Sequence, residues 1–205
     1  MLPVIDAIIL AAGKSERFGR PKVLQTFLGE PFVTRIITNL REAGVRNVSL
    51  VMGYKAGEYI RQLPQSGFPY IVINSNYEKG QFSSLQVGLE SVNENADGVI
   101  MTLVDCPHLP LKVYKDLVDA ACAHPDKVII PTYQSKGGHP IFLPGILFDE
   151  ILGSDPDENL RDLLTRHPGL IYRHPVKEPG ITMDIDTPED LVRLEKIYGR
   201  SPDKR

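Results

Sequence analysis

Residues 4–13 read VIDAIILAAG, an apolar run that ends in two alanines and a glycine. The run is short, aliphatic and partly β-branched, as is typical of a strand buried in a parallel sheet. The small residues after it indicate a turn out of that strand. This stretch therefore predicts a buried first strand over residues 4–10 and a loop directly after it.

Strand-like and helix-like patterns alternate along the rest of the chain. Because strands separated by helices pair in parallel with right-handed crossovers, we expect a three-layer α/β/α sandwich with a Rossmann-like, mostly parallel sheet. Ser83 or Ser84 is expected to cap one helix, and Thr187 another, with Pro188 in its first turn. Further strands are predicted over 47–52, 70–73, 99–104, 128–130 and 181–185. Further helices are predicted over 31–43, 56–63, 83–92, 113–122, 160–164 and from 188.

Length and composition narrow the class of protein. A chain of 205 residues predicts one domain over 1–200 and a polar tail over 201–205. No apolar run approaches the ~18 residues needed to cross a bilayer, so we expect no membrane association. Lys and Arg total 23 against 26 acidic residues, which disfavours nucleic acid as a partner. Two cysteines and no signal-peptide pattern predict a cytoplasmic protein.

The loop after the first strand concentrates positive charge. The stretch LAAGKSERFGRPK (residues 10–22) holds four cations against one acid, a local charge of +3 in a chain of net charge −3. Arg forks onto phosphate oxygens, Lys supplies a point charge, and small residues let main-chain N–H groups approach a ligand. Ligands of such folds bind beyond the carboxyl ends of the strands, so the loop predicts a polyphosphate site.

Two common phosphate motifs do not match this loop, and a solvated basic surface loop is the alternative to a phosphate site. A Walker loop has four residues between its glycines and Lys-Ser or Lys-Thr after the second. Here five residues separate Gly13 from Gly19, and Arg20-Pro21 follow. The G-x-G-x-x-G dinucleotide fingerprint is also absent, which disfavours a nicotinamide-dependent oxidoreductase.

Three aspartates are candidate magnesium ligands. Asp105 follows the apolar run 99–104, where a carboxylate is costly unless it reaches the ligand crevice or is paired. Asp184 and Asp186 are two residues apart on an expected strand, so their side chains are expected on one face. Magnesium is commonly held by one or two carboxylates together with substrate phosphates. The alternatives are a solvent-facing Asp184 and an Asp186 that favours the start of the following helix.

Three further signals for functional residues are weaker. Ser83 and Ser84 could donate to a base or ribose, although helix capping explains a serine pair equally well. His139, between glycine and proline, could contact an acceptor substrate, with an unmatched surface histidine as the alternative. No activating partner for Cys106 can be identified from the sequence, so we expect a small buried thiol without chemistry.

The loop at residues 10–22 resembles the signature LAAGxSxRxGxxK of the MobA-like nucleotidyltransferases, and the most similar branch is that of the molybdenum cofactor cytidylyltransferases. The resemblance implies a fold like that of the nucleotide-diphospho-sugar transferases. Four further blocks are similar to those of the family and follow in its order: GQFSSL at 80–85, DCP at 105–107, GHP at 138–140 and DIDTPED at 184–190.

The resemblance also implies roles for particular residues. Catalytic roles are implied for Arg17, Lys22 and Asp105, and Mg²⁺ binding for Asp105 and one of Asp184 and Asp186. His139 is expected at the acceptor. Contacts to the nucleoside triphosphate are expected from Leu10, Ala11, Ala12, Gly13, Ser15, Arg17, Lys22, Ser83 and Ser84.

These implications favour transfer of CMP from CTP to a phosphorylated acceptor with release of pyrophosphate, because the Ala-Ala-Gly start is more similar to cytidylyl-transferring than to guanylyl-transferring members. Molybdopterin is the implied acceptor, and a molybdoenzyme or its chaperone is the expected protein partner. A guanylyltransferase and a sugar- or polyol-phosphate nucleotidyltransferase of the same fold remain alternatives. So does a nucleotide-binding accessory protein without catalytic activity.

Overall fold

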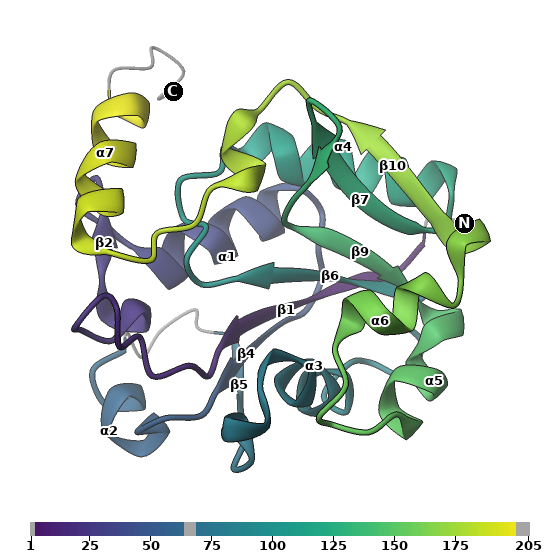
Figure 1. The fold of residues 1–205 in the computed structure, drawn as a ribbon, viewed down its shortest axis with the longest axis horizontal. Coiled ribbons are helices and arrows are strands. Elements are labelled where there is room, and N and C mark those ends of the chain that lie inside the picture. The colour runs from purple at the N-terminus through teal and green to yellow at the C-terminus, as the bar shows by residue number, and fades with distance from the viewer. Residues whose placement is uncertain (1–2, 64–68, 200–205) are drawn as a thin grey trace.

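The computed structural model describes residues 3–63 and 69–199. Figure 1 shows a central sheet with helices on both sides. Over the described residues the sheet has eight strands in the order β10-β7-β9-β6-β1-β4-β5, with β8 paired to β7, while β2 and β3 pair separately. The strands are β1 (Ile5–Ala11), β2 (Thr26–Phe27), β3 (Glu30–Pro31), β4 (Val48–Met52), β5 (Tyr70–Ile73), β6 (Gly98–Leu103), β7 (Val128–Tyr133), β8 (Lys136–Gly137), β9 (Ile141–Pro144) and β10 (Ile171–Pro175). The helices are α1 (Phe32–Glu42), α2 (Ala56–Ile60), α3 (Gln81–Leu89), α4 (Leu111–Ala123), α5 (Phe148–Gly153), α6 (Leu160–Thr165) and α7 (Pro188–Tyr198).

Strand β1 lies in the middle of the parallel part of the sheet. It pairs in parallel with β4 on one side and with β6 on the other, and β4 pairs in parallel with β5. Strand β9 runs antiparallel between β6 and β7, while β7 and β10 are parallel. The prediction of an α/β fold with a mostly parallel sheet is confirmed.

Alternate residues of β1 pack on opposite faces of the sheet, as the two-residue period of a strand requires. Ile5, Ala7 and Ile9 join a buried cluster that includes residues of α1, α4 and α7. Ile8 and Leu10 join a second cluster with residues of α3, α5 and α6. The two clusters fill the space on either side of the sheet, so the predicted three-layer α/β/α sandwich is confirmed.

Main-chain hydrogen bonds bring three distant segments together at the carboxyl end of β1. Leu10 is paired with Leu103, so the ends of β1 and β6 lie side by side. The N–H of Val104 then donates to the carbonyl of Leu10 at 3.1 Å. Much later in the chain, the N–H of Ile185 donates to the carbonyl of Asp105 at 3.0 Å. The loop after β1 therefore faces both the turn after β6 and the segment before α7.

The strand predicted over residues 181–185 is wrong. Residues Pro179–Thr182 form a 3₁₀ turn, in which the carboxylate of Glu178 accepts from the N–H of Gly180 at 2.8 Å. The residues that follow have no sheet pairing and reach α7 as irregular chain. The alternating apolar pattern is explained by burial, since Ile181 and Ile185 are 2% and 0% exposed.

Helix α3 begins before the serine pair. Its N-cap is Gly80, whose φ of +98° is left-handed and favours glycine, and Ser83 Oγ donates to the Gly80 carbonyl at 2.8 Å. Neither serine caps the helix, so that prediction is wrong. Helix α7 starts as predicted. Thr187 Oγ1 accepts from the N–H of Asp190 at 3.2 Å, and the Asp190 carboxylate accepts from the N–H of Thr187 at 3.1 Å, which is a capping box.

Several further elements differ from the sequence pattern. Strands β2, β3, β8, β9 and β10 and helix α5 were not predicted, and α2 ends at Ile60 rather than at Leu63. Pro64, which was expected to end that helix, and the tail expected over 201–205 lie outside the described residues. Among the described residues, no helix combines the length and the apolar character needed to cross a membrane.

Candidate functional site

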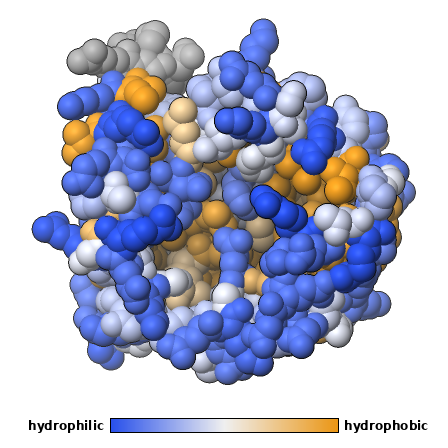
Figure 2. Space-filling model, in the orientation of Figure 1, coloured by the Kyte–Doolittle hydropathy of each residue, from blue (hydrophilic) through white to orange (hydrophobic). Residues whose placement is uncertain are grey.

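A cavity of about 740 Å³ opens at the carboxyl ends of β1 and β6. Figure 2 shows it as a recess left of centre, with an apolar floor and hydrophilic side chains around it. A volume in this range is typical of small-molecule sites. The lining residues are Leu10, Ala11, Ala12, Gly13, Lys14, Ser15, Glu16, Arg17, Pro21, Lys22, Val23, Tyr59, Tyr77, Glu78, Gly80, Gln81, Ser84, Leu103, Val104, Asp105 and Asp186.

Most residues that the sequence singled out lie on this cavity. The expected nucleotide contacts do so except for one serine, and two of the three candidate metal ligands, Asp105 and Asp186, also line it. Ser83, Asp184 and His139 are not part of the lining. Asp184 is nevertheless close to Asp105, as described below, whereas His139, on the turn before β9, belongs to neither the lining nor that pair.

The loop after β1 is held in shape by its own main chain. Ser15 has a left-handed φ of +55°, and its carbonyl accepts from the N–H groups of Phe18 and Gly19 at 3.1 and 3.0 Å. Lys22 N–H donates to Ser15 Oγ at 3.3 Å and closes the loop. Phe18 is buried and anchors it, so the Arg17 side chain stays on the outside, 74% exposed. The loop thus presents the guanidinium group of Arg17 at the cavity.

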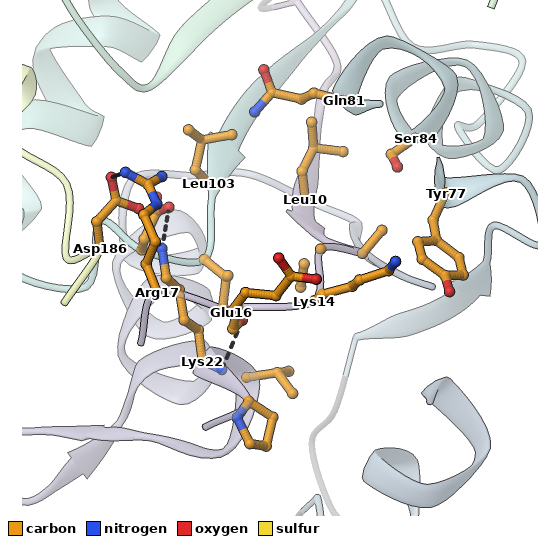
Figure 3. A pocket seen from close by; sticks show the side chains of 18 of the residues that line it. Leu10, Lys14, Glu16, Arg17, Lys22, Tyr77, Gln81, Ser84, Leu103 and Asp186 are labelled. Atoms are coloured by element: carbon orange, nitrogen blue, oxygen red, sulfur yellow. Dashed lines mark hydrogen bonds and ion pairs between the residues drawn. The ribbon is translucent and has the colours of Figure 1, made fainter. Parts of the chain in front are cut away.

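Lys22 connects three segments that are far apart in the sequence. Its Nζ donates to Asp105 Oδ2 at 3.0 Å and to Asp186 Oδ1 at 2.8 Å, while the Arg17 guanidinium lies 3.0 Å from Asp186 Oδ2. Figure 3 shows Arg17 and Lys22 both reaching Asp186 on one side of the cavity. Burial lowers the pKa of Lys22, but the two carboxylates outweigh it and raise that pKa above its ordinary value. Lys22 is therefore a charged group held in a fixed position.

A second group of donors lies beside this ion cluster. One ligand atom from each of Asp105, Cys106 and Asp184 falls within 4.8 Å of the other two. Burial, and then the charge of Asp105, raise the pKa of Asp184 above its ordinary value. Two carboxylates that repel each other at this distance are suited to a divalent cation, because the cation would neutralise both.

The two C-terminal aspartates have different partners, although both lie near Asp105. Asp186 points to Lys22 and Arg17, whereas Asp184 lies with Asp105 and Cys106. The segment that carries them is irregular chain, not the strand on which the expectation of a shared face was based. Asp186 already has two cationic partners, so the geometry favours Asp184 as the partner of Asp105 at a metal.

Cys106 is buried as predicted, at 1% exposure. Its thiol lies 3.5 Å from Asp184 Oδ1 and 3.6 Å from Asp105 Oδ1. Burial, followed by the charges of Asp105 and Asp184, raises the pKa of Cys106 well above its ordinary value. The thiol is thus protonated at neutral pH and is no nucleophile.

The far side of the cavity carries polar groups that the sequence interpretation partly missed. Figure 3 shows Ser84 and Tyr77 there, opposite Asp186, with Gln81 between the two sides. Asn74, buried at 1% exposure, donates from Nδ2 to the hydroxyls of Ser83 and Ser84, both at 3.0 Å. Asn74 directly follows β5, so its position at a strand end was the signal that could have found it.

His139 is half-buried rather than on the surface. It precedes Pro140 through a cis peptide bond, and its N–H donates to the carbonyl of Ile181 at 2.9 Å. Its Nδ1 is buried without a hydrogen-bond partner among the described residues. Burial lowers the pKa of His139, although the charge of Asp105 acts in the other direction. The ring is therefore neutral, and its role at an acceptor stays a prediction.

Comparison with known proteins places the chain in a family. A family model described as the MobA-like NTP transferase domain matches residues 7–170. Molybdenum cofactor cytidylyltransferase of Escherichia coli is 25% identical over 197 residues, which cover 96% of this chain and 98% of the relative. Nicotine blue oxidoreductase of Paenarthrobacter nicotinovorans is 26% identical over 203 residues, which cover 94% of this chain and 97% of the relative. Molybdenum cofactor guanylyltransferase of Rhizobium johnstonii is 24% identical over 204 residues, which cover 94% of this chain and 92% of the relative.

Solved structures share the fold. The crystal structure of Rv0371c from Mycobacterium tuberculosis superposes with a TM-score of 0.82 at 24% identity and covers 96% of this chain and 99% of its own. A second structure of Rv0371c, in complex with manganese, gives a TM-score of 0.77 at 23% identity. It covers 94% of this chain and 98% of its own. At these identities the likeness concerns the arrangement of the elements.

Proposed function

The chain belongs to the MobA-like NTP transferase family, and we propose that this nucleotidyltransferase moves CMP from CTP to a phosphorylated acceptor, molybdopterin first among the candidates, and releases pyrophosphate. The ion cluster of Lys22, Arg17, Asp105 and Asp186 at the edge of the cavity carries the proposal. It gathers phosphate-binding cations and carboxylates from three distant segments at one end of a crevice that has room for a nucleotide.

A divalent cation, which we propose to be Mg²⁺, would be held by Asp105 and Asp184. The fit rests on the closeness of the two carboxylates and on the raised pKa of Asp184, which burial and then the charge of Asp105 cause. When bound, such an ion would neutralise charge on the α-phosphate and on the departing pyrophosphate. The manganese complex of Rv0371c, a protein of the same fold, is consistent with a divalent ion.

The residues of the chain itself supply positioning and charge. Arg17 and Lys22 are paired with Asp186. Triphosphate oxygens would offer both cations stronger anionic partners, and Gly13 and Ser15, which also line the cavity, could add main-chain N–H donors. A terminal phosphate oxygen of the acceptor would then form its bond to the α-phosphorus while the bond to the bridging oxygen breaks. That oxygen leaves with the electron pair as pyrophosphate, so no covalent enzyme intermediate is needed.

Ser84 is the proposed contact on the base side. Its hydroxyl accepts from Asn74 Nδ2, which leaves the hydroxyl proton available to the cavity. A cytosine carbonyl is a suitable acceptor for that proton. The Ser83 hydroxyl donates to the Gly80 carbonyl, and Ser83 is not part of the cavity lining. We therefore assign Ser83 a supporting position behind Ser84. His139 and its orphaned Nδ1 remain our proposed acceptor contact.

The test is pyrophosphate release with CTP, GTP, ATP or UTP, each with Mg²⁺ and molybdopterin, and with chromatography of the product. Release with CTP and formation of a cytidine dinucleotide would support the proposal. Release with GTP would instead indicate the guanylyltransferase alternative, which the Rhizobium relative favours. Nucleotide binding without release from any triphosphate would indicate an accessory protein. The similarity to an oxidoreductase adds one control, NAD(P)H oxidation in the same mixtures.

A further inference from the structure

The thiol of Cys106 lies at the centre of the carboxylate pair and has no role in the proposed transfer. Its Sγ is 3.5 Å from Asp184 Oδ1 and 3.6 Å from Asp105 Oδ1. All three ligand atoms lie within 4.8 Å of one another. Two oxygens and one sulfur at these distances are a donor set that one ion could bind together.

Main-chain hydrogen bonds position the two segments that carry the three donors. The N–H of Cys106 donates to the carbonyl of Leu103 at 3.3 Å, so the turn after β6 positions Asp105 and Cys106 together. The hydrogen bond from Ile185 N–H to the Asp105 carbonyl positions the third donor, Asp184. Cys106 is buried at the base of the group, and Asp184 is exposed, so an ion could enter from the side of Asp184.

Sulfur and oxygen differ in the ions they prefer. Mg²⁺ binds oxygen ligands and does not displace a thiol proton, so beside Mg²⁺ the thiol would remain a hydrogen-bond donor to the two carboxylates. Zn²⁺, Co²⁺ and Cd²⁺ accept thiolate together with carboxylate ligands. The same three residues would therefore present different donors to the two kinds of ion.

We propose that this metal centre is a mixed oxygen and sulfur site, in which Cys106 becomes a third ligand beside Asp105 and Asp184 when a thiophilic divalent ion binds. The thiol proton passes to solvent as the sulfur–metal bond forms, and no oxidation is involved. The inference rests on the proposed function in so far as Asp105 and Asp184 face the same cation. It adds a ligand to that site and makes Cys106 a determinant of metal preference.

The test is a titration of the full chain with Co²⁺ after removal of metals by a chelator, in the absence of nucleotide. We expect a near-ultraviolet sulfur-to-cobalt charge-transfer band that saturates at one equivalent. Cys106→Ser keeps a hydroxyl donor to both carboxylates and should lose the band. Cys122→Ser is the matched control, because this half-buried cysteine of α4 is the other free thiol of the chain and should leave the band unchanged. Calorimetry should show Cd²⁺ affinity reduced on the order of tenfold or more in Cys106→Ser, with Mg²⁺ affinity unchanged.

Three results would overturn the proposal. These are Co²⁺ binding without the band, a band that persists in Cys106→Ser, and a band that disappears in Cys122→Ser. Circular dichroism and melting curves of each variant establish that it is folded, and Cys106→Ala provides a second variant if the serine does not fold. The assay contains no nucleotide, so its outcome is separate from that of the transferase. A cobalt band without pyrophosphate release would leave the sulfur ligand in place and contradict the transferase alone.

Discussion

Lys22 is the residue on which most of the site depends. Its side chain is 10% exposed and its ammonium group lies between Asp105 and Asp186, which belong to segments 83 and 164 residues away in the sequence. Removing the cation would leave the carboxylates of Asp105 and Asp186 without this partner, and breaking a buried ion pair is strongly destabilising. We interpret it as a fixed charge that aligns the acids and stabilises the phosphates during transfer.

Lys22→Ala should therefore lower kcat/KM for nucleotidyl transfer. We expect a loss of roughly 2–4 kcal/mol of transition-state stabilisation, the scale of removing one preorganised donor. Pyrophosphate release measures the loss, and a melting curve establishes that the variant is folded. Lys112→Ala is the control, because this exposed lysine of α4 pairs with Asp116 away from the cavity. Unchanged turnover in Lys22→Ala would remove this lysine from the mechanism.

Asp184 and Asp186 should respond differently to loss of charge. Asp184→Asn removes one carboxylate of the pair with Asp105, so the Mg²⁺ concentration that gives half-maximal rate should rise on the order of tenfold or more. Asp186→Asn removes the partner of Arg17 and Lys22 instead, and should change the KM for the triphosphate more than the Mg²⁺ requirement. Steady-state rates over a matrix of Mg²⁺ and CTP concentrations separate the two effects. Equal Mg²⁺ requirements in both variants would contradict this assignment.

Among the elements, α7 determines where Asp186 lies. The helix begins at the capping box of Thr187 and Asp190, directly after Asp186. The Asp190 carboxylate also accepts from the N–H of Asp186 at 3.3 Å. The start of this helix therefore fixes the backbone that carries one partner of Lys22.

Thr187→Ala should destabilise the protein through this element. Loss of a threonine N-cap costs about 1 kcal/mol of the free energy of unfolding, because the N–H of Asp190 loses its acceptor. Chemical denaturation measures the change. Thr182→Ala, at an exposed threonine that bonds only within its own turn, is the matched control and should cost less. A variant as stable as the native chain would show that the cap does not hold α7.

Asp190 should make the stability of the folded protein depend on pH. Burial raises the pKa of Asp190, but hydrogen bonds from Thr187 and the charge of Arg193 outweigh it and lower that pKa below its ordinary value of 3.8. A carboxylate with a lowered pKa contributes stability above its ordinary pKa and loses it as the pH falls through the value in the folded protein. The difference in Tm between the native chain and Asp190→Asn should be present at pH 7 and should close in acid below pH 3.8. A difference that is independent of pH would exclude the charge as its cause.

The elements that the sequence predicted well are those with a continuous apolar pattern. Strand β5 has the predicted bounds, and β1 and β6 differ from theirs by one residue at each end. Strand β10 was missed because IYRHP mixes polar residues into an edge strand, and β9 because it is short and ends in proline. The segment at 181–185 has the alternating pattern of a strand, but its apolar residues fill a core without pairing.

In the whole molecule, the sequence predicted that the loop after the first strand and Asp105 lie at one crevice, but not which charged group each aspartate faces. Spacing could not show that Asp186 faces Lys22 while Asp184 faces Cys106, since that depends on an irregular segment packed against the turn after β6. Gln81 was not singled out, because its place on the cavity depends on how α3 packs against the sheet. The likeness of five sequence blocks to one family supplied the reaction class.

The central claim is that the loop after β1 binds a nucleoside triphosphate, and that Asp105 and Asp184 hold a divalent cation beside it. The most direct measurement is the Tm of the chain with CTP, GTP, ATP or UTP, each with and without Mg²⁺. At 100 times Kd, a ligand stabilises the folded state by about 2.7 kcal/mol, or ~5–10 °C for a chain of this length. We predict the largest shift with CTP and Mg²⁺ together, and its loss in the double variant Arg17→Ala, Lys22→Ala. No shift with any triphosphate, or an equal shift in the double variant, would contradict the account.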